Sequence, residues 1–143
     1  MAGYSGTPLA ERLGVKEGHR VGVFGDPGHF GELVDPLPAG AELISNPRSA
    51  CDIYVVFAPD RQRFVDRLAK LITKLEPDAS VWISWPKRTS GVATDMIEDV
   101  VREVALPLHL VDIKVCAVDD TWSGLKLVVR TEHRAAWPDR VRA

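Results

Sequence analysis

The chain has 143 residues, 45% of them hydrophobic and 27% charged, with a formal net charge of −2. This size and composition predict one globular domain with a sizeable core. The small net charge provides no overall positive field, so we expect no nucleic-acid partner. No apolar run approaches the roughly 18 residues of a membrane span, and Met1–Gly18 lacks a secretory signal pattern, so we expect a cytoplasmic protein and no membrane partner.

The beginning of the chain predicts a short helix followed by a strand. Thr7 suits the N-cap, Pro8 suits the first helical position, and Gly14 can end the helix in a left-handed conformation. An apolar strand is expected over residues 20–25, where Val21, Val23 and Phe24 stand.

A glycine-rich turn follows this strand, with Gly25, Asp26, Gly28 and Gly31 in the spacing G-x-x-G-x-x-G. A turn of this kind after a first strand favours a nucleotide-type ligand, because backbone N–H groups can approach it closely. The spacing is not G-x-G-x-x-G, however, and Pro27 removes one N–H. An ordinary tight loop is therefore an equally good interpretation.

Two more strands are expected over Ala41–Ser45 and Cys51–Ala58, and the second reads as a buried parallel strand. Only about half a dozen residues connect them, whereas a parallel crossover normally needs a dozen or more. The chain either crosses in an extended loop, which we favour, or the two strands pair antiparallel. Asn46 ends the first of these strands, where cofactor-binding α/β domains often place an acid for ribose hydroxyls.

Two long helices complete the core pattern. Apolar residues at three- and four-residue spacing predict a helix over residues 61–75, with Asp60 as its N-cap. A second helix is expected after Asp95, which together with Glu98 forms the pattern of a capping box, and Pro107 should end or bend it.

The loop between residues 85 and 95 is the best candidate for a ligand edge. It follows a buried strand, and ligands of open α/β sheets bind at the carboxyl ends of strands. Its candidate binding residues are Trp85, Lys87, Ser90, Thr94 and Asp95. A lysine, hydroxyl groups and a helix N-terminus together favour an anionic ligand, although Asp95 itself would partly fill that position.

The last strands, residues 113–118 and 125–130, predict an antiparallel hairpin. Its turn carries Asp119 and Trp122, which can complete a ligand site or simply pack on the domain edge. The four histidines lack metal-ligand spacing, so we expect no metal site. Residues 131–143 are polar and predict a weakly ordered tail to a single domain over residues 1–130.

The order of elements resembles a shortened class I methyltransferase domain. At closer range, YSGTPLAERLGVKEGHRV and the block from WPKRTSGVATDM to LKLVVR are similar to a bacterial family known as domain of unknown function 3052. The resemblance implies a Rossmann-like three-layer α/β fold, with a mostly parallel sheet that ends in an antiparallel hairpin. It also implies that a strand and a helix are missing between Ser45 and Cys51, and it supplies no reaction.

Two functional hypotheses remain. In the first, the chain binds a small ligand, S-adenosylmethionine-like or anionic, at the edge formed by the glycine loop, Asp60 and the 85–95 loop, with no strong catalytic machinery. If the chain has an activity, Lys87 and Asp95 are the residues to substitute first. In the second, it is a non-catalytic interaction module that forms a homodimer or binds a protein partner through a sheet edge or Trp122.

Overall fold

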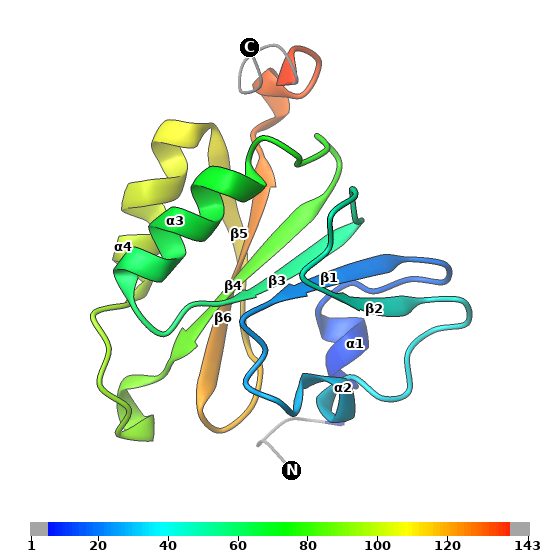
Figure 1. The fold of residues 1–143 in the computed structure, drawn as a ribbon, viewed down its shortest axis with the longest axis vertical. Helices are drawn as coiled ribbons and strands as arrows, with labels where there is room; N and C mark the ends of the chain where they lie inside the picture. Colours follow the sequence, from blue (N-terminus) through cyan, green and yellow to red (C-terminus); the bar gives the residue numbers. More distant parts are fainter. Residues whose placement is uncertain (1–5, 138–143) are drawn as a thin grey trace.

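In the computed structural model, which describes residues 6–137, one six-stranded sheet carries helices on both faces (Figure 1). The strands are β1 (Arg20–Phe24), β2 (Glu42–Ser45), β3 (Ile53–Phe57), β4 (Ser80–Pro86), β5 (Leu110–Ala117) and β6 (Trp122–Val129). The α-helices are α1 (Leu9–Arg12), α2 (Phe30–Leu33), α3 (Arg61–Leu71) and α4 (Glu98–Ala105). Among these residues, no helix has the length and apolar character needed to cross a bilayer.

The strand order is β2-β1-β3-β4-β6-β5. The first four strands are parallel, whereas β6 runs antiparallel to both β4 and β5. The expected mostly parallel sheet with a terminal antiparallel hairpin is therefore confirmed. The hairpin also inserts β6 beside β4, which leaves β5 at the edge of the sheet.

Along the central strands, successive side chains pack on opposite faces of the sheet, which gives a layer of helices on each side of it. On β3, Tyr54 and Val56 pack in the cluster that contains the buried residues of α3 and α4, while Ile53, Val55 and Phe57 pack in the cluster that contains α1 and α2. Successive side chains of a strand point to opposite faces, so an apolar residue at every position requires both faces to be covered. Figure 1 shows α3 and α4 on one side of the sheet and α1 and α2 on the other.

The connection from β2 to β3 crosses in an extended conformation, as favoured from the sequence. Asn46 N–H donates to the Val23 carbonyl and Asp52 N–H to the Arg20 carbonyl, so residues 46–52 are tied to both ends of β1. The segment packs directly on β1, because a Cβ on Gly22 would lie 2.5 Å from Pro47 Cγ. A glycine at this position thus allows a crossing without a covering helix.

The helix starts differ from the sequence predictions. The N-cap of α1 is Pro8, with no side-chain capping hydrogen bond, so the prediction that Thr7 caps this helix is wrong. Gly14 does follow α1 in a left-handed conformation, with φ +84°. The helix is only four residues long and is held by burial of Leu9 and Ala10 rather than by a cap.

The predicted capping box at Asp95 and Glu98 is also wrong. Helix α4 begins at Glu98 after an N-cap at Ile97, and no side chain caps it. Asp95 instead accepts a hydrogen bond from Arg61 N–H at 2.7 Å, while Asp60 accepts from Arg63 N–H at 2.9 Å. Asp60 therefore caps α3 as expected, and Asp95 satisfies a second N–H of the same helix.

The start of the predicted tail belongs to the fold. Residues Thr131–His133 form a 3₁₀ turn, and the side chain of Trp137 is fully buried against the α3 and α4 face. Its indole N–H donates to the Leu75 carbonyl at 2.7 Å. The described fold therefore extends to Trp137, beyond the domain end expected at residue 130, and the rest of the expected tail, residues 138–143, lies outside the described part.

Candidate functional site

The predicted site residues lie around the carboxyl ends of the parallel strands. Gly25, Asp26 and Gly28 follow β1, Asp60 follows β3, and Lys87 follows β4. The hairpin turn reaches the same edge, because Lys87 N–H donates to the Thr121 carbonyl at 2.7 Å.

The glycine loop is organised by its own side chains. One oxygen of Asp26 accepts hydrogen bonds from Gly28 N–H at 2.8 Å and from Phe30 N–H at 3.4 Å. Gly25 has φ +70°, and a Cβ there would lie 2.5 Å from the Phe57 carbonyl oxygen. The sequence pattern of this loop is therefore explained by a tight turn packed against β3, with two of its N–H groups already bonded.

A contact between His29 and Asp119 joins this loop to the hairpin turn. His29 Nε2 lies 2.7 Å from an Asp119 oxygen, although 90 residues separate the two positions. The other oxygen of Asp119 accepts from the N–H groups of Thr121 and Trp122. Sequence reasoning missed His29 because no spacing signal connects positions so far apart in the chain. Asp119 holds the hairpin turn through the N–H groups that it accepts from.

The Asp119 carboxyl has an altered acidity. Burial opposes its ionisation, but the hydrogen bonds from His29 and from the Trp122 and Thr121 N–H groups outweigh burial and lower the pKa below its ordinary value of 3.8. A carboxyl whose pKa is depressed by folding stabilises the native state above the unfolded pKa. This stabilisation is lost as the pH falls through the folded pKa.

We therefore expect the Asp119→Asn variant to lose less stability than the wild type on acidification. The measurement is urea unfolding at a series of pH values from about 5 to about 2.5. Asp120→Asn, at the exposed neighbouring position, is the matched control and should follow the wild-type curve. Parallel curves for Asp119→Asn and wild type would contradict the proposed role of this carboxyl.

Trp122 packs within its own chain, one of the two roles expected for it, and Asn46 stands at the end of β2. The Trp122 and Phe57 rings form a T-shaped contact, with centroids 5.1 Å apart and an interplanar angle of 89°. Trp122 is half-buried. Asn46 is exposed at the end of β2, in a left-handed conformation with φ 47°.

Hydroxyl groups of the 85–95 loop shape the loop itself. Thr94 Oγ1 donates to the Pro59 carbonyl at 2.7 Å and accepts from Met96 N–H, which ties the loop to the end of β3. Ser90 Oγ donates to the Lys87 carbonyl at 2.6 Å. The expected helix N-terminus near these hydroxyls is absent, since α4 starts at Glu98 and carries two acids in its first turn.

This loop nevertheless encloses a pocket of about 590 Å³. Its lining includes Trp85, Lys87, Arg88, Thr89, Thr94, Met96, Ile97, Glu98 and Ser123. Within residues 6–137, the Lys87 ammonium group has no hydrogen-bond or ion-pair partner, whereas Glu98 is paired with Arg102 at 2.7 Å. The pocket therefore combines uncompensated positive charge with an apolar wall. No group of side chains that could hold a metal ion occurs in the described part of the chain.

Several solved structures that align with this fold are methyltransferases. The ribosomal protein L11 methylase of Lactobacillus delbrueckii subsp. bulgaricus aligns with a TM-score of 0.60 and 13% identity, over 85% of this chain and 75% of that one. The fold is the Rossmann-like fold of class I methyltransferases. The Methanococcus jannaschii fibrillarin pre-rRNA processing protein aligns with a TM-score of 0.59 and 10% identity, over 90% and 71% of the two chains.

A third neighbour is a complex of DhpI with SAH, at a TM-score of 0.55 and 11% identity, over 87% of this chain and 84% of that one. No family model matches the sequence, and no curated protein matches it. The similarity to domain of unknown function 3052 is therefore not confirmed, and the methyltransferase-like fold stands on the structural comparison.

The end of β2 lacks the acid that is common in cofactor-binding α/β domains, as the sequence indicates. A ribose diol is commonly held by an acid at the end of the second strand, and Asn46 stands there instead. The carboxylate of Asp26 is used within its own loop. At the end of β2, Asn46 thus stands where an acid commonly holds the ribose of the cofactor.

Proposed function

We propose that this chain is a cytoplasmic domain that binds a small anionic molecule in the pocket beside β4. The observation that carries the proposal is that Lys87 lines a pocket of about 590 Å³ and that its ammonium group has no acidic partner in residues 6–137. Small-molecule sites are typically concave, largely apolar and supplied with a few polar groups. We assign binding to this pocket and no reaction.

The pocket lining indicates the chemistry of the ligand. Lys87, Arg88 and Thr89 provide two cations and a hydroxyl on one part of the wall. A carboxylate or phosphate suits these groups, because charge-assisted hydrogen bonds are the strong ones. The other part of the wall is apolar and includes Trp85 and Met96. A flat or aliphatic body attached to the anion therefore suits the pocket.

We expect the Lys87→Ala substitution to weaken binding of an aromatic carboxylate, for which benzoate is a suitable probe, by about tenfold or more. The reason is that a hydrogen bond to a charged group contributes about 1.5–3 kcal/mol. The measurement is an NMR titration of backbone amides, with shifts expected over residues 85–94. Lys16→Ala, which removes an exposed lysine outside this pocket, is the control and should bind as the wild type does.

The same NMR titration, with S-adenosylmethionine in place of benzoate, tests the second candidate ligand. This candidate is favoured by the fold shared with the solved methyltransferase structures and by the SAH bound in one of them. Saturable shifts at Gly25–Gly28 and Asn46 would support that cofactor. Benzoate binding unchanged by Lys87→Ala would contradict the anion proposal.

The interaction hypothesis is tested by Trp122→Ala, measured by analytical ultracentrifugation. Because Trp122 packs on Phe57 of its own chain, we expect no change of oligomeric state. A change, with Lys87→Ala silent, would favour an interaction module.

A further inference from the structure

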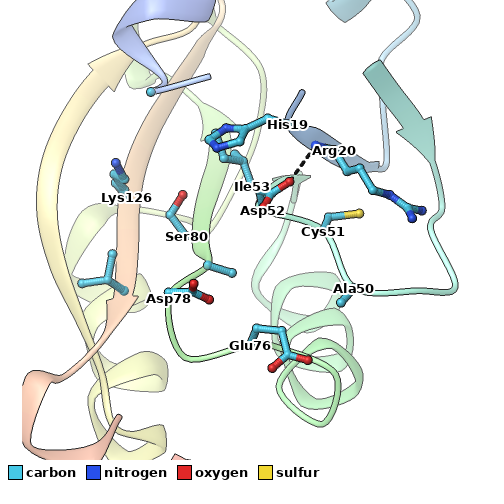
Figure 2. Close-up of a pocket in the computed structure, with 13 residues that line it drawn as sticks. His19, Arg20, Ala50, Cys51, Asp52, Ile53, Glu76, Asp78, Ser80 and Lys126 are labelled. Atoms are coloured by element: carbon cyan, nitrogen blue, oxygen red, sulfur yellow. Dashed lines mark hydrogen bonds between the residues drawn. The ribbon is translucent and has the colours of Figure 1, made fainter. Parts of the chain in front are cut away.

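A second pocket, of about 430 Å³, lies at the opposite edge of the sheet, beside the amino ends of β1, β3 and β4. Figure 2 shows the side chains that line it, with Lys126 on the wall formed by β6 and Asp52 on the facing wall. None of the site residues suggested by the sequence lies here. This volume is within the usual range of small-molecule sites.

Two permanently charged cations line this pocket, Arg20, whose guanidinium donates to Ser49 Oγ at 2.8 Å, and Lys126. The Lys126 side chain is the cation considered for ligand binding. It is half-buried, its Nζ lies 5.9 Å from the centroid of the Trp82 ring, and it has no hydrogen-bond or ion-pair partner in residues 6–137. Burial, together with the charges of Lys114 and Lys16, lowers the pKa of Lys126. An ammonium that is half-buried beside two like charges is stabilised when an anion binds next to it.

Two neutral donors lie near this wall. His19 Nδ1 accepts from Lys16 N–H at 3.1 Å, so the proton of the neutral ring is on Nε2. Ser80 is only 8% exposed, and its hydroxyl has no protein partner in the described part of the chain. In Figure 2, the His19 ring and the Ser80 hydroxyl lie between the Lys126 wall and the Asp52 wall. Both groups can donate to an acid bound at Lys126.

The facing wall and the floor are acidic. Asp52 is held in place because one of its oxygens accepts from Arg20 N–H at 2.8 Å, drawn as a dashed line in Figure 2. Asp78 and Glu76 line the floor of the same pocket. These carboxylates repel a ligand that is only anionic, and Lys126 repels one that is only cationic, because like charges brought together at a binding site are costly.

We propose that this pocket binds a small zwitterion of the amino-acid class. The acid group of the ligand lies at Lys126, with His19 and Ser80 as further donors, and its amino group lies towards Asp52 and Asp78. Opposite charges on facing walls select a molecule that carries both charges and reject its singly charged analogues. This site is independent of the anion pocket beside β4, which lies at the carboxyl edge.

The test is an NMR titration of the full chain with glycine and 4-aminobutyrate, compared with butyrate and butylamine as singly charged analogues of the second. We expect at least one amino acid to give saturable shifts at residues 19–20, 51–53 and 78–80. Its affinity should exceed that of each singly charged analogue by about tenfold or more.

Two variants complete the test. Lys126→Met should reduce the affinity for that amino acid by about tenfold or more, and Asp78→Asn should reduce it as well. Lys70→Met removes an exposed lysine of α3 that is outside the pocket, and it should leave binding unchanged. The proposal is overturned if neither amino acid gives saturable shifts, if butyrate binds as tightly as the amino acid, or if folded Lys126→Met binds like the wild type.

Discussion

Replacing Trp137 with alanine is expected to lower the free energy of unfolding by about 3–5 kcal/mol, the usual cost of truncating a buried tryptophan. The ring is fully buried in the cluster that contains α3 and α4, and its N–H is bonded to the Leu75 carbonyl. Removal of the side chain leaves a cavity and removes the hydrogen bond to the Leu75 carbonyl. Chemical denaturation, followed by circular dichroism, measures the effect.

The Trp137→Phe variant separates the two contributions. It retains most of the apolar contact but loses the hydrogen bond to the Leu75 carbonyl, which costs about 1 kcal/mol. Its loss of stability should therefore be smaller than that of Trp137→Ala. If both variants unfold at the denaturant concentration of the wild type, the terminal segment does not stabilise the domain.

The Gly25→Ala substitution is expected to lower the free energy of unfolding by about 3 kcal/mol or more. Part of this loss is the strain of an L-residue at φ +70°, and part is the contact at 2.5 Å between the new Cβ and the Phe57 carbonyl oxygen. That oxygen belongs to the backbone of β3, so it cannot move aside without disturbing the strand pair.

Gly18→Ala is a closely matched control, because Gly18 has φ +73° and a Cβ there meets nothing within 4 Å. It should show only the strain of the left-handed conformation, about 1–2 kcal/mol. Both variants are compared by denaturant unfolding. Equal losses would mean that the close approach to Phe57 adds nothing and that φ alone explains the glycine at position 25.

Several features of the fold follow directly from local pattern. The continuous apolar run of β3 predicts a parallel strand covered on both faces, because alternate side chains must both be buried. The apolar stripe of α3 and its Asp60 cap predict the helix and its first residue, since both depend on neighbours within a few positions. The short connection from β2 left two possibilities, an extended crossing, which we favoured, and an antiparallel pair. The structure has the extended crossing.

Prediction of the candidate site depended more on contacts between residues far apart in the chain than prediction of the fold did. Sequence reasoning identified the 85–95 loop as a ligand edge, and the loop does line a pocket that contains Trp85, Lys87 and Thr94. It could not anticipate that Asp95 bonds to the start of α3 rather than to α4. A capping pattern indicates only that a carboxylate lies close in sequence to the first N–H groups of the helix that follows it. It gives no information about α3, whose first residue, Arg61, lies 34 residues before Asp95.

The sequence by itself determined where most strands and helices lie and which faces of β3 and α3 are buried, because periodicity and side-chain volume act locally. Only the tertiary structure decided that β6 lies between β4 and β5, that His29 meets Asp119, and that Trp137 closes the core. It alone placed Lys126 and Asp52 on facing walls of one pocket. The physical reason is that these contacts join residues far apart in the chain, and their formation depends on which strand edges and faces pair.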